Sequence, residues 1–206
     1  MGKPDLLMEI FKRQNELWDK YKVIEGDLPD GPVEINSYSG QRVIKDFLWR
    51  ITEEIMEAVD ALGKNDKDLI REELSDALHF IVELFLITQT VPNTWVLNDI
   101  ILSSRVDTPV LSRDGGQRGM EKAPLDFPQA VLRTVYRLGM VGNLLKNKPW
   151  KQTPVETDEK EFREKLNQAF ISFIGVFDSS FTTAEEIHSV YMGKAEINKT
   201  RQEEKY

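Results

Sequence analysis

Two pairs of carboxylates have the spacing of successive helical turns. Glu54 and Glu57 are three residues apart, as are Glu73 and Asp76. Side chains three residues apart on a helix project in neighbouring directions, so each pair would present its two carboxylates together. Two carboxylates about 5 Å apart repel each other by roughly 3 kcal/mol at an effective dielectric constant near 20. A cluster of four is therefore expected to need a bound cation.

The helical pattern places these acids beside apolar side chains. Glu54 shares its sector of the helical wheel with Phe47, and Glu73 shares its sector with Phe80. Acids on an apolar stripe are expected to face other parts of the protein. The alternative is that all four acids are solvated, as helical glutamates usually are.

Magnesium is the cation that this arrangement favours. Glu53 and Glu72 point away from the stripe, and we interpret them as solvated surface acids. The chain has no cysteine, so a metal site must use carboxylates or the two histidines. Carboxylate oxygens that leave room for water and phosphate suit Mg²⁺. The sequence therefore predicts a Mg²⁺ site and a substrate that is a phosphate ester.

A stripe of hydrogen-bond donors follows the last predicted helix. Tyr191, Lys194, Asn198 and Arg201 are spaced three, four and three residues apart, within one arc of the helix. A hydroxyl, an ammonium, an amide and a guanidinium together suit a polyphosphate. A solvated basic face is the alternative for this stripe.

The apolar periodicity predicts an all-α fold. Thr183 and Glu186 have the spacing of a capping box at a helix start, and Gly63 fits a helix C-cap. Pro and Gly residues mark residues 103–128 as a mobile loop excursion. Helices are expected over residues 4–21, 41–62, 67–90, 129–145, 159–177 and 183–202, and a short one can form over 94–102.

The chain also contains an apparent internal repeat. Residues 72–85 align without a gap with residues 164–177, but Lys165 and Gln168 replace the two acids. We therefore expect a bundle of two helical hairpins, the second a degenerate repeat of the first, with added N- and C-terminal helices. Coincidental alignment of two amphipathic helices is the alternative.

Composition limits the class of protein. With 206 residues, of which 40% are hydrophobic and 30% charged, the chain fits one globular domain, 1–206. A net charge of −8 argues against binding to a nucleic-acid backbone. The sequence has no apolar run long enough to span a membrane and no signal peptide, so we expect a cytoplasmic protein.

Several segments resemble one family. The acid pairs read ExxE and ExxD, and they are accompanied by RQNELWD, ELSDALHF and YMGKAEINKTRQEEKY. These features resemble the all-α, MazG-like nucleoside triphosphate pyrophosphatases, and most of all the dimeric dUTPases and the phage dCTP/dUTP pyrophosphatases. The resemblance implies Mg²⁺-dependent hydrolysis of a deoxynucleoside triphosphate, dUTP and/or dCTP, to the monophosphate and pyrophosphate. It also implies a homodimer.

The resemblance implies a role for each candidate residue. It assigns the four acids to Mg²⁺ and makes Glu54 the group that orients and deprotonates the attacking water. The phosphate-binding residues are Lys194, Asn198 and Arg201, and the residues near the base and sugar are Gln14, Trp18 and His79. A structural role is the alternative for His79, because lone helical histidines are often structural.

The preferred base is left open by the sequence. The family's Trp-Lys-rich loop after the first acid pair is replaced here by GKNDKD. A pyrophosphatase of broader specificity, including purine nucleotides, is therefore an alternative. A non-catalytic helical regulator and a metal-free structural bundle are the alternatives from outside the enzymes.

Overall fold

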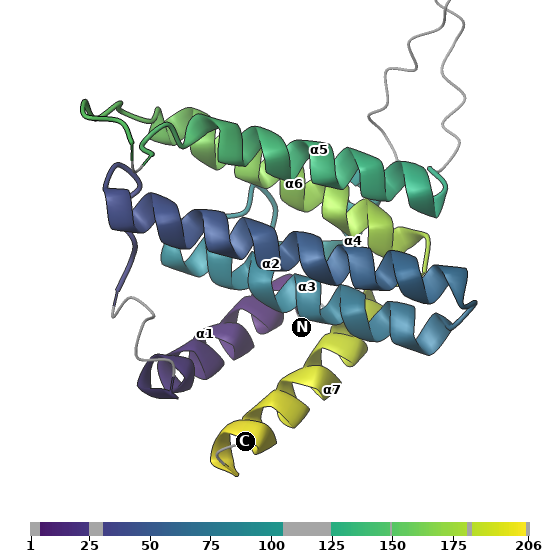
Figure 1. Ribbon diagram of the computed structural model, residues 1–206. Coiled ribbons are helices and arrows are strands. Elements are labelled where there is room, and N and C mark those ends of the chain that lie inside the picture. The colour runs from purple at the N-terminus through teal and green to yellow at the C-terminus, as the bar shows by residue number, and fades with distance from the viewer. Residues whose placement is uncertain (1–4, 25–30, 105–124, 149, 181–182, 205–206) are drawn as a thin grey trace, which may run out of the picture.

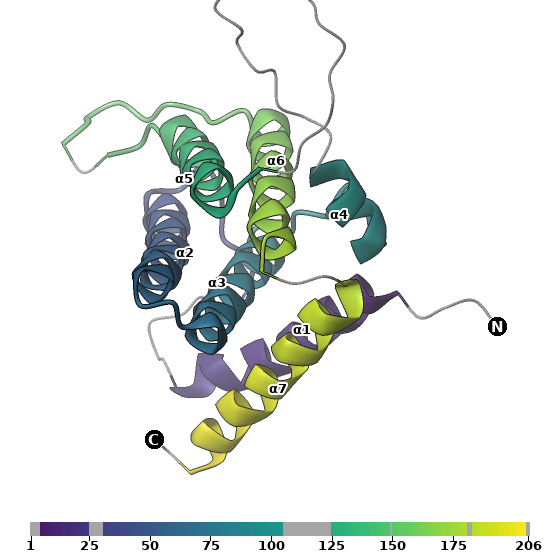
Figure 2. The same ribbon diagram turned by 90° about the vertical axis from the view of Figure 1, so that its right-hand side faces the viewer.

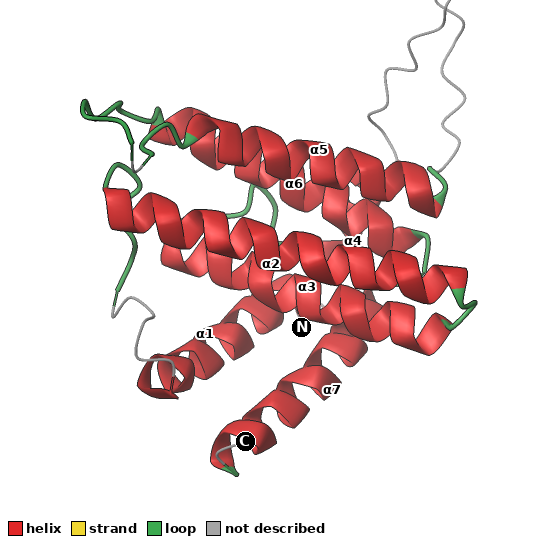
Figure 3. Cartoon of the chain, viewed as in Figure 1, coloured by secondary structure: helices red, strands yellow, loops and turns green. Residues whose placement is uncertain are grey.

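Helices form all of the regular structure in the residues that the computed structural model describes, which are 5–24, 31–104, 125–148, 150–180 and 183–204 (Figure 3). The predicted all-α fold is confirmed. Among these residues no helix is both long and apolar enough to cross a membrane. The helices are α1 (Leu6–Ile24), α2 (Tyr38–Gly63), α3 (Lys67–Ile87), α4 (Leu97–Ser104), α5 (Phe127–Leu144), α6 (Glu159–Asp178) and α7 (Ala184–Glu203).

The start of α2 lies three residues before the predicted position, because Ser37 caps the helix. The Ser37 hydroxyl oxygen accepts a hydrogen bond from the main-chain N–H of Gly40 at 2.9 Å. A Cβ atom at Gly40 would lie 2.1 Å from the main-chain oxygen of Glu34. Only glycine fits this tight entry into the helix.

The turn between α2 and α3 differs from the prediction in one detail. Gly63 is the last helical residue, Lys64 is the cap, and the left-handed conformation falls on Asn65, with φ of 56°. Asparagine tolerates this region better than most residues. Three residues therefore separate the two helices, which return antiparallel to each other.

The end of α3 comes three residues earlier than predicted. The Thr88 hydroxyl donates to the main-chain oxygen of Leu84 at 2.7 Å, and Gln89 adopts a left-handed conformation with φ of 49°. Arg163 of α6 donates to the main-chain oxygen of Thr88 at 2.6 Å. The helix thus ends where Arg163 of α6 can donate a hydrogen bond to the carbonyl group of Thr88.

Two helical hairpins make up most of the bundle. Helices α2 and α3 form one, helices α5 and α6 form the other, and α5 lies alongside α2 (Figure 1). Helices α1 and α7 pack against each other and against α3, while α4 packs against α6 (Figure 2). The predicted bundle of two hairpins with added N- and C-terminal helices is confirmed.

Aromatic side chains join the two hairpins and α1. Phe85 of α3 lies 5.2 Å from Phe170 of α6 and 5.9 Å from Phe11 of α1, measured between ring centroids. Phe85 and Phe170 are almost completely buried. These rings belong to one continuous cluster of buried apolar residues that includes side chains from all seven described helices.

In the second hairpin, a neutral residue stands where the alignment places one of the predicted metal ligands. Gln168 stands where the alignment places Asp76, and its side-chain oxygen accepts a hydrogen bond from Arg137 of α5. A neutral amide paired with a cation needs no metal ion. The repeat relation itself stays a prediction, as does the single domain, and most of the expected excursion (103–128) lies outside the described residues.

Replacing Asp66 with alanine should destabilise the hairpin that carries the acids. The Asp66 carboxylate accepts a hydrogen bond from the main-chain N–H of Leu69 at 3.0 Å and so caps α3. Loss of such a cap costs about 1 kcal/mol, which urea unfolding can measure. Asp66→Asn keeps the capping oxygen and serves as the control. Equal losses from the two substitutions would contradict a capping role.

Candidate functional site

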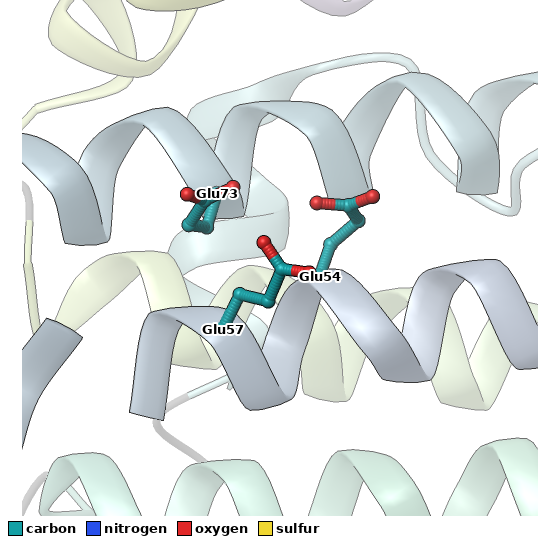
Figure 4. A group of neighbouring side chains, drawn as sticks. All are labelled: Glu54, Glu57 and Glu73. Carbon is teal, nitrogen blue, oxygen red and sulfur yellow. The ribbon is translucent and has the colours of Figure 1, made fainter. Parts of the chain in front are cut away.

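Three carboxylates converge between α2 and α3. Glu54 and Glu57 of α2 face Glu73 of α3, and one oxygen atom from each lies within 4.8 Å of the other two (Figure 4). The antiparallel hairpin produces this arrangement, because residues late in α2 lie opposite residues early in α3. The structure thus brings together three of the four predicted metal ligands.

Glu54 and Glu73 of this cluster have raised pKa values. Burial, together with the nearby negative charges of Asp76, Glu57 and Glu73, raises the pKa of Glu54 to about 7. Burial and the charge of Glu57 also raise the pKa of Glu73. Repulsion among the acids is therefore relieved by protonation when no cation is present.

The cluster fits the coordination chemistry of magnesium. Mg²⁺ takes an octahedron of oxygen ligands at about 2.1 Å, which places ligand oxygens roughly 3–4 Å apart. The three carboxylate oxygens lie within 4.8 Å of one another, and the set contains no sulfur or nitrogen ligand. These oxygen ligands suit Mg²⁺.

Asp76, the fourth predicted ligand, is paired with a lysine. Its carboxylate lies 2.8 Å from the ammonium nitrogen of Lys194 on α7. The carboxylate of Glu72 lies 2.8 Å from the same nitrogen. Glu72 is exposed, as predicted for a surface acid, but the sequence analysis did not foresee its ion pair with Lys194.

The charges of this ion-paired group are strongly coupled. Hydrogen bonding and the positive charge of Lys194 lower the pKa of Glu72. Burial raises the pKa of Asp76 in spite of Lys194. Burial acts to lower the pKa of Lys194, but its hydrogen bonds with Asp76 and Glu72 raise the pKa overall. Lys194 therefore carries a full positive charge at neutral pH.

A cavity of about 220 Å³ connects the acids with the basic residues of α7. Its walls come from α1, α2, α3 and α7, so residues far apart in the sequence meet there. Glu54 and Asp76 lie on one side, and Lys194, Asn198 and Arg201 contribute donors from α7. Three of the four predicted phosphate-binding residues therefore line the cavity.

Aromatic rings form another wall of the cavity. Trp18 lies 6.1 Å from Phe47, and Phe47 lies 6.3 Å from Phe80, between ring centroids. The guanidinium of Arg50 lies 5.6 Å from the centroids of both phenylalanine rings. Such a wall suits a flat heterocycle. The sequence analysis missed Arg50, although its position three residues after Phe47 places the two side chains together.

Gln14 is the centre of a buried polar network. Its amide nitrogen donates to Glu83 at 2.6 Å, and its amide oxygen lies 2.6 Å from Nδ1 of His79. The Tyr191 hydroxyl donates to the same oxygen, and the Tyr191 ring stacks on His79 with centroids 4.1 Å apart. Gln14, His79 and Glu83 line the cavity.

Tyr191 lies deeper than the phosphate-binding prediction requires. Its side chain is fully buried, and its hydroxyl bonds to Gln14 rather than lining the cavity. Sequence reasoning also missed Glu83. Its position on α3, four residues after His79 and among apolar side chains, is a signal that could have identified it.

Comparison with known proteins identifies the family. A protein-family model described as dUTPase matches residues 60–206, well over half of the chain. The chain belongs to the dUTPase family. No curated protein and no solved structure gave a match. The dUTPase family match and the helical fold make the protein a nucleotide pyrophosphatase of the MazG-like, helical type.

The dUTPase match covers only part of the site. Glu73, Asp76, His79 and the basic residues of α7 lie within residues 60–206. Gln14, Trp18, Glu54 and Glu57 precede the matched region. The cavity is the independent reason to include Gln14, Trp18 and Glu54, and the carboxylate cluster is the reason to include Glu57.

Proposed function

We propose that this protein hydrolyses dUTP and/or dCTP to the nucleoside monophosphate and pyrophosphate, with Mg²⁺ as cofactor. One observation carries the proposal. The same cavity is lined by Glu54 of the carboxylate cluster, by the hydrogen-bond donors of α7 and by the aromatic wall. A triphosphate, a divalent cation and a flat base are the ligands that these three surfaces would bind.

The acids would hold the metal. Glu54, Glu57 and Glu73 supply the oxygens, and Asp76 lies beside them for a further contact. When bound, Mg²⁺ would neutralise charge on the phosphates and polarise a phosphoryl oxygen. The main task of the carboxylates is to position the phosphates against the attacking water.

Glu54 is the proposed general base. Glu54 belongs to the carboxylate cluster and also lines the cavity, so its carboxylate lies where an attacking water could meet the phosphates. Its carboxylate would orient the water and accept its proton. The oxygen of the water forms a bond to phosphorus, a phosphorus–oxygen bond of the bridge between the α and β phosphates breaks, and pyrophosphate leaves without a covalent enzyme intermediate.

The basic residues of α7 would bind the phosphates. Lys194 and Arg201 are cations, and Asn198 offers an amide donor between them. Lys194 would leave its carboxylate partners for a phosphate oxygen as the metal takes over the acids. Tyr191 is not included, because its hydroxyl is engaged with Gln14.

The base would lie against the aromatic wall. Trp18, Phe47 and Phe80 provide apolar surface, while Gln14 and His79 provide polar atoms near the base and sugar. We further propose that the protein is a cytoplasmic homodimer. The exposed Trp49 and Tyr136, on α2 and α5, are apolar surface that a second subunit could cover.

Pyrophosphate release from a panel of nucleotides tests the proposal. We expect release from dUTP, from dCTP or from both, and little from dTTP, dATP and dGTP, at millimolar Mg²⁺. Glu73→Gln should reduce release at least about 100-fold, because it removes a metal ligand. Glu53→Gln, an exposed acid on α2, should leave it unchanged.

Other outcomes separate the alternatives. Release from purine nucleotides at similar rates would indicate the pyrophosphatase of broader specificity. No release from any nucleotide would overturn the proposal and leave the non-catalytic helical regulator. Equal loss in Glu53→Gln and Glu73→Gln would show that the carboxylate cluster is not the metal site.

A further inference from the structure

Glu72 contacts a proposed phosphate-binding residue without belonging to the carboxylate cluster or to the cavity lining. It lies on α3 next to Glu73, and its carboxylate accepts a hydrogen bond from the Lys194 ammonium at 2.8 Å. Among the described residues, the cavity lining includes Lys194 and Asp76 but not Glu72, and the cluster of possible metal ligands also leaves it out. The proposed binding of metal and phosphate therefore gives no role to Glu72.

The two carboxylates that share Lys194 differ in burial. The side chain of Asp76 is 22% exposed and that of Glu72 is 53% exposed, while an oxygen of each lies 2.8 Å from the same nitrogen. A buried carboxylate that loses its cation incurs a large desolvation penalty, whereas water solvates an exposed one. Glu72 is therefore the partner that can release Lys194 with little loss of free energy.

Glu72 interacts with both cations of α7 that line the cavity. The hydrogen bond and the positive charge of Lys194 lower the pKa of Glu72, and the charge of Arg201 lowers it further. Glu72 is thus ionised at neutral pH. Its carboxylate and a phosphate group in the cavity would attract the same two cations, Lys194 and Arg201.

The ammonium of Lys194 is well placed to exchange one anion for another. It is carried on a flexible four-carbon chain, and the side chain is only 9% exposed, so it needs an anionic partner whenever no phosphate is bound. Lys194 lines the cavity and Glu72 does not, so Glu72 holds the ammonium at the boundary of the cavity. An entering phosphate must compete with this contact.

We propose that Glu72 is a positioning residue that holds Lys194 while the cavity contains no phosphate and competes with phosphate for its ammonium. This inference rests on the proposed function and refines it, because it names a residue that sets the affinity of the phosphate-binding group. Bound phosphate displaces Glu72, and the return of Lys194 to Glu72 favours release of pyrophosphate. The affinity for nucleotide is therefore lower than the cations of α7 alone would give.

Binding of a nucleotide that resists cleavage between its α and β phosphates tests the competition. The probe is the α,β-imido analogue of dUTP, titrated by calorimetry at millimolar Mg²⁺. Glu72→Gln keeps the size of the side chain and removes the competing charge, so we expect about threefold to tenfold tighter binding of the analogue. Equal or weaker binding by Glu72→Gln would overturn the proposal.

Asp68→Asn is the matched control for the loss of one negative charge. Asp68 lies one turn before Glu72 on α3, its side chain is 96% exposed, and it pairs with Arg71 at 3.7 Å. Because salt screens such an exposed charge, we expect less than about a twofold change in binding of the analogue. If both variants tighten binding equally, net charge explains the effect and the proposal is wrong.

A double-mutant cycle shows whether Glu72 acts through Lys194. Lys194→Met removes the ammonium and keeps an unbranched side chain, so most of the tightening caused by Glu72→Gln should be lost in this background. An effect of the same size with and without the ammonium would show that Glu72 does not compete for Lys194.

Inhibition by pyrophosphate is a second measurement that separates the positioning role from a structural one. We expect pyrophosphate to inhibit Glu72→Gln about threefold to tenfold more strongly than the wild-type protein. If Glu72 only stabilised the contact between α3 and α7, Glu72→Gln would lower the melting temperature and bind pyrophosphate no more tightly. That combination would overturn the proposal.

The failures of the two proposals are distinguishable. Pyrophosphate release by the wild-type protein, without tighter binding of the analogue by Glu72→Gln, would overturn the competition alone. Absence of analogue binding together with absence of pyrophosphate release would overturn both.

Discussion

Replacing Glu54 with glutamine is expected to reduce pyrophosphate release by about 10²–10⁴-fold and to stabilise the metal-free protein. The loss of activity follows from removing the proposed general base and a metal ligand. The gain in stability follows from removing one charge of a carboxylate cluster whose members lie within 4.8 Å of each other. Few substitutions at surface acids would change both properties in opposite directions.

The raised pKa of Glu54 also predicts how the stability of the metal-free protein changes with pH. The folded protein raises the pKa of Glu54 from 4.5 to about 7, chiefly through burial, so between these values the folded state binds more protons than the unfolded state. Stability without metal should therefore fall as pH rises from about 4.5 to about 7. Glu54 is only half-buried, so solvent screening limits its share to about 1–2 kcal/mol.

Thermal melting at pH 5, 6, 7 and 8, with a chelator and with Mg²⁺, measures both parts. Without metal, Glu54→Gln should flatten the pH dependence and melt at a higher temperature at pH 7. With Mg²⁺ the wild-type protein should gain stability and the variant should gain much less. Glu53→Gln is the matched control, and a lower melting temperature for metal-free Glu54→Gln would contradict the charge-repulsion argument.

Replacing Phe85 with alanine should cause the largest loss of stability. The ring is completely buried and contacts Phe170 of the second hairpin and Phe11 of α1. Truncation of a buried phenylalanine costs about 3–5 kcal/mol, because the cavity that it leaves collapses only partly. At about 2–4 °C per kcal/mol for a chain of this size, the melting temperature should fall by roughly 6–20 °C.

Calorimetry can also show whether the two hairpins unfold together. Because Phe85 belongs to both packing surfaces, we expect one transition that moves as a whole in Phe85→Ala. Phe85→Leu keeps most of the volume and should lose clearly less. A second transition that stays at the wild-type temperature would show that the second hairpin is stable by itself.

The helices and their pairing could be predicted from the sequence because they depend on local patterns. Apolar periodicity indicated α2 and α3, and the spacing of Thr183 and Glu186 indicated the capping box that the structure contains, with reciprocal hydrogen bonds of 3.1 Å. Helix ends were less predictable. The end of α3 depends on Arg163, a residue of α6 that no local pattern connects with it.

The candidate site could be predicted only in part, because spacing along a helix does not reveal its neighbours. Helical spacing brought Glu54, Glu57 and Glu73 together correctly. It did not show that Asp76 and Glu72 would share Lys194, which depends on how α7 crosses α3. Spacing also does not show how deeply a side chain is buried. Tyr191 lies on the predicted stripe of α7, but its side chain is fully buried.

The double ion pair of Lys194 couples cation and anion binding. A phosphate that binds Lys194 leaves the carboxylates of Asp76 and Glu72 without their cation. A cation that binds Asp76 removes one of the two carboxylates that pair with Lys194. Binding of either ligand therefore removes the unfavourable free energy of the unpaired charges that binding of the other ligand creates. By thermodynamic reciprocity, the factor by which Mg²⁺ tightens nucleotide binding equals the factor by which the nucleotide tightens Mg²⁺ binding. The protein would thus select the metal–nucleotide complex over either component alone.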